Sequence, residues 1–287
     1  MIGKSIFTSS EECLISYRLK QYQGFLMGFI VVLLLSFFNV GAVNAENLTV
    51  QEIVEKANNV AYYEGQDGTA EVNMAITDSQ GRKRVREFTI LRKDVADGGE
   101  QKFYIYFYKP EDVRDMVYMV WKHTTKEDDR WLYLPALDLV RRIAASDKRS
   151  SFVGSHFVYE DVSGRGINED THELVGEENN CYKIKNVPKN KKNINFDYYY
   201  IWIRKDNFIP IKTEYYDSHG KKYRIIEGLK VENIQGYPTI IEMKAEDLNS
   251  GGNTVITYKK IKYNIGLTDD IFTERYLRRP PAQWIKR

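Results

Sequence analysis

The stretch AEVNMAITDSQG, residues 70–81, indicates the fold class of this chain most directly. Apolar and polar residues alternate along it, and a period of two is typical of a half-buried β-strand. The apolar positions are Ala70, Val72, Met74 and Ile76. Turn-forming residues follow at 78–81, and residues 84–92 return as a second alternating segment. The pattern therefore predicts a β-hairpin.

Segments with the same character recur along the rest of the chain. They lie at 102–108, 116–122, 130–134, 139–143, 171–176, 181–187, 196–204, 209–217, 221–231, 237–247 and 254–265. Short turn signals separate several of them, and short connections favour antiparallel pairing. Strands do not alternate with long helical segments, so a parallel α/β sheet is not expected.

Helices are predicted in only two places. Thr49 and Glu52 have the spacing of a capping box, and the apolar positions after them recur at helical spacing over residues 49–62. A short helix is expected at 268–277. About twelve strands in one sheet tend to curl or close. We therefore expect a mainly β protein, with a strongly curved antiparallel sheet whose concave side is apolar and whose opening the helices plug.

Aromatic residues occupy both faces of some predicted strands. Tyr198, Tyr200 and Trp202 share one face of the strand near 196–204, and Tyr199, Ile201 and Ile203 share the other. One interpretation is a core packed on two sides. The other is that one face lines a cavity for a hydrophobic ligand, because a wide curved sheet with few helices leaves such space.

Composition and motifs argue against several classes of function. The chain has 287 residues and a net charge of +2, which gives no electrostatic case for nucleic-acid binding. Its two cysteines cannot form a disulfide framework or a Cys-based zinc site. The four histidines lack the spacing of a metal site, and Ser155-His156 is not part of a nucleophile elbow. We expect no catalytic residues, no metal and no cofactor.

The first 45 residues read as a secretory signal. Basic residues precede an uncharged apolar stretch, and small residues follow up to Ala45. We predict cleavage near Ala45, which leaves residues 46–287 as a single exported domain. The alternative is an uncleaved N-terminal membrane anchor, because residues 25–43 carry no charge and approach the length that crosses a bilayer.

The segment 130–166 holds two adjacent arginines, Arg141 and Arg142. Neighbours in a strand face opposite sides, so we expect one of them to face inward. A buried guanidinium needs a partner, and the nearest candidates are Asp147, Glu160 and Asp161. The pair is then either a structural tie that holds a loop, or a latch for a lid or a contact for an anionic lipid headgroup.

The same segment carries a family resemblance. Its pattern W-x-Y-x-P, VRRI, SDK and F-x-GS-x-F-x-YED, between Trp131 and Asp161, resembles the outer-membrane lipoprotein-sorting protein family, relatives of the periplasmic lipoprotein carrier LolA. Residues 266–277 are similar to the end of that family. The resemblance implies an incomplete, half-open antiparallel β-barrel closed by a few helices around a hydrophobic cavity. It also implies transit of lipidated cargo across the periplasm and, in some relatives, association with an RND-type exporter.

These inferences together predict a carrier of a lipoprotein or a lipid that is monomeric and touches membranes transiently. The alternative is a non-enzymatic accessory subunit of an RND-type lipid exporter that serves as a docking platform. The helix at 49–62 and the loop at 144–166 are the candidate lids. The candidate cavity or lid residues are Trp131, Tyr133, Leu134, Arg141, Arg142, Phe152, Phe157, Tyr198, Tyr200 and Trp202.

Overall fold

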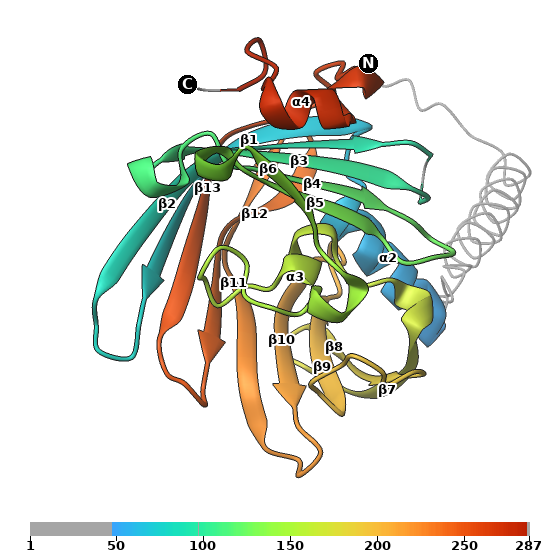
Figure 1. Ribbon diagram of the computed structural model, residues 1–287. Helices are drawn as coiled ribbons and strands as arrows, with labels where there is room; N and C mark the ends of the chain where they lie inside the picture. Colours follow the sequence, from blue (N-terminus) through green and yellow to red (C-terminus); the bar gives the residue numbers. More distant parts are fainter. Residues whose placement is uncertain (1–47, 97, 286–287) are drawn as a thin grey trace, which may run out of the picture. The chain divides into compact units, whose positions relative to one another are not determined.

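A single curved sheet dominates residues 48–96 and 98–285, which are the residues that the computed structural model describes (Figure 1). The predicted signal segment 1–45 lies outside them. The sheet has thirteen strands. They are β1 (Asp67–Thr77), β2 (Lys83–Asp94), β3 (Gln101–Lys109), β4 (Val117–Lys122), β5 (Asp129–Leu134), β6 (Leu139–Arg142), β7 (Asp170–Glu178), β8 (Cys181–Pro188), β9 (Tyr198–Arg204), β10 (Pro210–Tyr216), β11 (Lys222–Ile234), β12 (Tyr237–Asp247) and β13 (Asn253–Tyr263). Each strand-like segment of the sequence is one of these strands.

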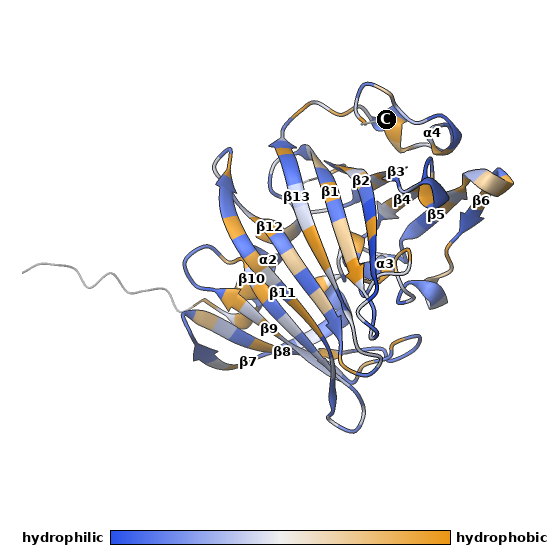
Figure 2. Ribbon diagram, turned by 90° about the vertical axis from the view of Figure 1, so that its left-hand side faces the viewer, coloured by the Kyte–Doolittle hydropathy of each residue, from blue (hydrophilic) through white to orange (hydrophobic). Residues whose placement is uncertain are grey.

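The strand order shows that the sheet does not close. It runs β6-β5-β4-β3-β2-β1-β13-β12-β11-β10-β9-β8-β7, so β6 and β7 are its two free edges. Every neighbouring pair is antiparallel, as the short connections predicted. The predicted half-open antiparallel β-barrel with few helices is therefore confirmed. Figure 2 shows the alternation of apolar and polar residues along the strands that made the prediction possible.

Helix α2 (Val50–Tyr62) begins where the sequence predicted. The backbone N–H of Glu52 donates to Thr49 Oγ1 (3.2 Å), and the backbone N–H of Thr49 donates to Glu52 Oε2 (2.7 Å), which completes the capping box. Ile53, Val54 and Ala57 are buried and pack on Ile184 and Ile203 of the sheet. Contacts of α2 with β7 and β12 place the helix across the concave side.

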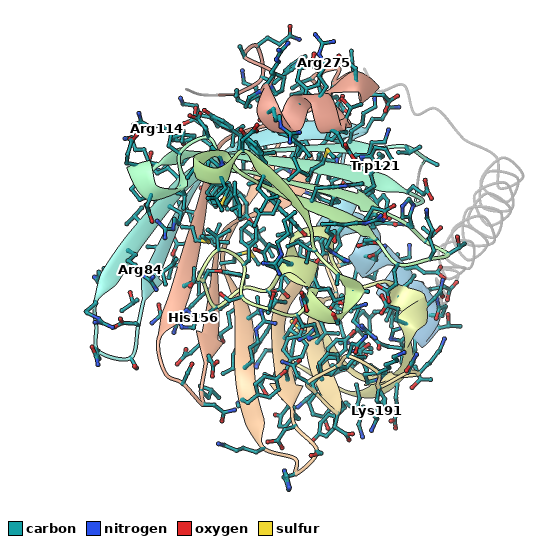
Figure 3. The ribbon with its side chains drawn as sticks, viewed as in Figure 1. Arg84, Arg114, Trp121, His156, Lys191 and Arg275 are labelled. Atoms are coloured by element: carbon teal, nitrogen blue, oxygen red, sulfur yellow. The ribbon has the colours of Figure 1, made fainter. Side chains whose placement is uncertain are left out.

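The convex side of β3 to β5 has a cover of its own. The C-terminal segment, with a 3-10 turn at Asp269–Phe272 and the short helix α4 (Glu274–Arg278), packs there against Tyr104 and Trp131. Trp121, labelled in Figure 3, donates through Nε1 to the carbonyl of Phe272 (2.9 Å). The helix predicted at 268–277 is thus split in two, because Thr273 has an extended backbone (φ −122°, ψ 159°).

Candidate functional site

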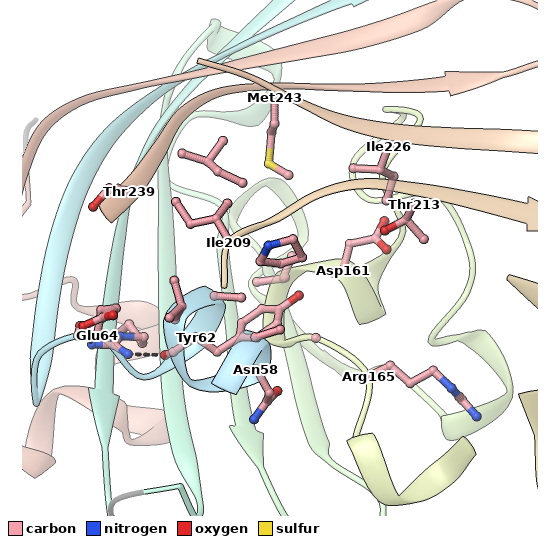
Figure 4. Close-up of a pocket in the computed structure, with 18 of the residues that line it drawn as sticks. Asn58, Tyr62, Glu64, Asp161, Arg165, Ile209, Thr213, Ile226, Thr239 and Met243 are labelled. Carbon is pink, nitrogen blue, oxygen red and sulfur yellow. Dashed lines mark hydrogen bonds between the residues drawn. The ribbon is translucent and has the colours of Figure 1, made fainter. Parts of the chain in front are cut away.

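A cavity of about 420 Å³ lies between the concave face of the sheet, helix α2 and the segment that includes α3 (Tyr159–Ser163) (Figure 4). This volume falls within the range of about 300–1,000 Å³ that is usual for ligand pockets. Most lining side chains are apolar and come from strands far apart in the sequence. Examples are Ala70, Ile90, Ile105, Ile201, Ile226 and Met243.

The register of the sheet decides which face of β9 lines the cavity. Ile201 is paired with Thr213 of β10, which is paired with Ile226 of β11, and all three line the cavity. Tyr199 and Ile203 share that face. The opposite face carries an aromatic row of its own, so the sequence pattern of β9 could not tell the inner face from the outer one.

Tyr198, Tyr200 and Trp202, three of the predicted site residues, lie on that opposite face and not among the residues that line the cavity. Their rings pack against one another and against Tyr216, which stacks on Tyr198 at 4.9 Å. Lysines from neighbouring strands cover them: Lys183 Nζ lies 4.8 Å from the ring centroid of Trp202. Trp202 is consequently only 8% exposed although it is on the convex side.

The predicted residues of segment 131–157 are divided among three environments. Phe152 and Phe157 line the cavity. Trp131 and Tyr133 pack beneath the C-terminal segment on the convex side, and Leu134 packs against the concave core next to the cavity. No sequence pattern separated these environments, because alternation along a strand does not say which side of the sheet faces the cavity.

Arg141 and Arg142 correct the expectation that one arginine would face inward. Both side chains are mostly exposed, at 58% and 67%. They pair with Asp147 (3.7 Å) and Asp129, respectively. The reason is that β6 is a free edge of only four residues, and three of the four, including both arginines, are exposed.

The buried arginines that hold the loop are others. Glu160 is 3% exposed, and its carboxylate lies 2.5 Å from Arg149 Nη1 and 3.4 Å from Arg165 Nη1. Lys148 Nζ is also 3.4 Å away. Burial by itself would raise the pKa of Glu160, but these three cations hold it below its usual value. Of the three expected partners of Arg141 and Arg142, only Asp147 pairs with one of them, whereas Glu160 pairs with arginines outside β6.

Asp161 forms the second tie of this loop. Arg224 of β11 donates to its carboxylate and also to the carbonyl of His156 (3.2 Å from Nη2). The Nδ1 atom of His156 is 2.8 Å from Thr254 Oγ1 on β13. Figure 3 labels His156 in the loop. The loop is therefore attached to two strands of the sheet by buried polar contacts.

Arg92 closes the other side of the cavity, and the sequence analysis did not single it out. Its guanidinium donates to the carbonyl of Tyr62, the last residue of α2, and to those of Glu64 (2.6 Å) and Gly65 (2.6 Å) just after the helix. The Tyr62 carbonyl is one that a helix end leaves without an intrahelical partner. The signal was present: Phe88, Ile90 and Arg92 alternate on one face of β2, and all three line the cavity.

Tyr62 connects this helix end to the loop. Its ring packs on Gly164, where an added Cβ would lie 2.4 Å from Tyr62 Cζ. The ammonium of Lys122 lies 4.9 Å from the centroid of the same ring and donates to the carbonyl of Ser163 (2.7 Å). Lys122 is 5% exposed, and burial lowers its pKa to about 8.

Chemically, this arrangement can hold an apolar chain away from water. Within residues 48–96 and 98–285, no group of three or more His, Cys, Asp or Glu side chains could hold a metal ion. In the same part of the chain, no helix is long and apolar enough to span a membrane.

Comparisons with known proteins bear on this site. A family model described as an uncharacterized protein matches residues 99–279. The crystal structure of a DUF1329 family protein from Desulfovibrio piger ATCC 29098 is 31% identical, with a TM-score of 0.73 over 79% of this chain and 98% of that one. No curated protein matches the sequence.

Two further solved structures share the fold. One is a putative outer membrane lipoprotein-sorting protein domain from Vibrio parahaemolyticus, 26% identical, with a TM-score of 0.72 over 79% of this chain and 97% of that one. The other is a LolA superfamily protein from Nitrosomonas europaea, 20% identical, with a TM-score of 0.63 over 80% and 99%. At that identity the second likeness concerns the fold alone.

Proposed function

This chain belongs to the family of DUF1329 and outer membrane lipoprotein-sorting proteins, which is LolA-like, and from that premise we propose that it is a periplasmic carrier. It shields acyl chains of a lipoprotein or lipid during transfer towards the outer membrane. The proposal includes residues 1–45 as the export signal and residues 46–287 as the carrier domain. It also includes an RND-type exporter of the inner membrane as a donor or acceptor, as the family resemblance implies.

The observation that carries the proposal is the apolar cavity of about 420 Å³ on the concave face. Burying a methylene group contributes about 0.8 kcal/mol, so a sixteen-carbon chain offers roughly 12 kcal/mol before any opposing cost. A carrier must release its load, and part of this free energy is offset if binding requires a lid to open.

Helix α2 is the better of the two candidate lids. Its end is held by hydrogen bonds from Arg92 and Gln101 to backbone carbonyls, and its buried face is three apolar side chains. The loop around α3 is instead held by Glu160 and Asp161 in buried ion pairs. A loop that moved away from these pairs would leave charges buried without partners, whereas movement of α2 separates no ion pair of the helix itself. We therefore assign the opening to α2.

Two measurements test the carrier function. Native mass spectrometry of the protein purified without detergent should detect a co-purified lipid or lipopeptide. An apolar fluorescent dye should brighten on binding, and palmitate should displace it. If the protein carries no lipid and gives no dye signal, the cavity is not a lipid site and the proposal is wrong.

A further inference from the structure

The size of the cavity limits what it can hold. An apolar cavity of about 150 Å³ accommodates one benzene molecule, which has six carbons. By that scale, a cavity of about 420 Å³ accommodates roughly seventeen carbons. We infer that this cavity shields a single acyl chain, so its cargo is a lipid with one chain. This inference rests on the proposed function and narrows the class of cargo.

Packed aromatic side chains occupy the rest of the concave side. Phe152 projects from the loop into a cluster with Phe88, Phe107 and Tyr118, at ring-centroid distances of 6.3, 6.0 and 5.5 Å. All four side chains are at most 4% exposed. A second chain would have to displace this cluster, because close-packed interiors leave no spare volume.

The loop that carries Phe152 cannot retreat at low cost. Arg149 and Glu160 flank it with a buried ion pair, and Asp161 pairs with Arg224 of β11. Removing either partner of such a pair leaves an uncompensated buried charge. This wall of the cavity is therefore set by the fold and does not adapt to cargo.

Movement of α2 does not enlarge the space that is shielded from water. The helix contributes Val54, Ala57 and Ala61 to the lining, so its displacement opens the cavity to water. An opened cavity admits a chain, but a second chain there would remain hydrated and would gain little. The one-chain limit thus applies to the state that shields cargo.

A rim of polar residues near the end of α2 offers a place where a head group would stay. Glu64, Thr239 and Lys262 line the cavity and are exposed or partly exposed. Figure 4 shows Glu64 and Thr239 together at one side, at the end of α2 and the start of β12. A single chain can extend inward from this rim while its head group remains in water.

Chain length gives the sharpest test. Saturated fatty acids of ten to twenty-two carbons are titrated into the delipidated protein, and binding is followed by dye displacement. Each added methylene should raise the affinity about fourfold, which corresponds to about 0.8 kcal/mol. The rise should stop at about sixteen to eighteen carbons, because longer chains protrude from the cavity.

Two neighbouring residues of β11 provide matched variants. Ile226 lines the cavity, whereas Ile225 is paired with Glu214 and Glu246 on the other face. With Ile226→Trp, the affinity should stop rising at a chain length several carbons shorter than in the wild type. Ile225→Trp adds the same bulk outside the cavity and should leave that limiting chain length unchanged.

Stoichiometry completes the experiment. Native mass spectrometry should give one palmitate per protein and one 1-palmitoyl-lysophosphatidylglycerol per protein, and dipalmitoylphosphatidylglycerol should bind no more tightly than the lysolipid. Two or more palmitates, tighter binding of the two-chain lipid, or an affinity that still rises at twenty-two carbons would overturn the one-chain inference alone. Failure of every fatty acid to bind would overturn the carrier function itself.

Discussion

At the scale of single residues, two buried charges have opposite surroundings. Glu160 has three cations within 3.4 Å of its carboxylate. Lys122 has a backbone carbonyl and the ring of Tyr62, and in the described part of the chain no carboxylate lies within salt-bridge distance of its ammonium. A charge without a close opposite charge is sensitive to pH, because burial disfavours the protonated form.

Lys122 should therefore make stability depend on pH in the alkaline range. Its pKa is about 8 in the folded protein and 10.5 ordinarily. Between these pH values the unfolded chain binds the proton and the folded chain does not, so the free energy of unfolding rises with pH by up to about 3 kcal/mol. Urea denaturation from pH 7.5 to 10.5 measures this rise. Tyrosine ionisation affects the wild type and Lys122→Met alike. The free energy of unfolding of the wild type minus that of Lys122→Met should therefore rise with pH.

A constant difference between the wild type and Lys122→Met over that range would show that the ammonium is not destabilised by burial. Lys122→Met should also lower the free energy of unfolding by an amount that does not change with pH, because Met cannot donate to the carbonyl of Ser163 as Lys122 does.

At the scale of elements, helix α2 and the loop around α3 should respond differently to loss of their ties. Arg92→Leu removes the guanidinium that donates to the carbonyls of Tyr62, Glu64 and Gly65 at the end of α2, and leaves only the bond from Gln101 to Tyr62. We expect release of bound palmitate to accelerate about tenfold, which corresponds to about 1.4 kcal/mol, and hydrogen exchange to increase at residues 62–65. Stopped-flow dye exchange measures the first effect. Arg84→Leu, at an exposed position of the same strand, should change neither.

Loss of the ion pairs that hold the loop around α3 should destabilise the folded protein and should not accelerate the exchange of cargo. Glu160→Gln leaves Arg149, Arg165 and Lys148 facing a neutral side chain, so the free energy of unfolding at pH 7 should fall by about 3–5 kcal/mol. Because the pKa of Glu160 is lowered on folding, its stabilisation is present above about 4.5 and is lost as pH falls further.

Denaturation curves at pH 7 and pH 3.5 check this expectation. The difference in the free energy of unfolding between the wild type and Glu160→Gln should be smaller at the lower pH. Glu173→Gln, at an exposed position on β7, is the matched control and should stay within about 0.5 kcal/mol of the wild type. A gap that is as wide in acid as at neutral pH would mean that the charge of Glu160 is not what holds the loop.

At the scale of the whole molecule, cargo should stabilise one cooperative unit, because residues of β1 to β3 and of β7 to β13 line the cavity. At a palmitate concentration one hundred times the Kd, binding adds about 2.7 kcal/mol to the free energy of unfolding. For a chain of this size the Tm should rise by about 5–10 °C. Calorimetry with and without palmitate measures the shift. A Tm that stays unchanged while palmitate is bound would place the ligand outside the folded core.

The strands and the capping box of α2 could be predicted because they are local. Alternation along β1 and the spacing of Thr49 and Glu52 act over a few residues, and both predictions are confirmed. The split of the terminal helix at Thr273 was not predicted, because it depends on how that segment packs over the convex side. The same holds for Arg141 and Arg142, whose exposure follows from the position of β6 at a sheet edge.

The sequence by itself determined that this protein is an antiparallel sheet with too few helices to cover it, since hydrophobic period and turn residues specify the strands and the short connections between them. It also carried the family motif between Trp131 and Asp161. Only the tertiary structure decided which face of each strand lines the cavity and which arginines tie the loop. A period of two defines two faces but not their direction, and ion pairs such as Asp161 with Arg224 join residues that meet only when the sheet curves.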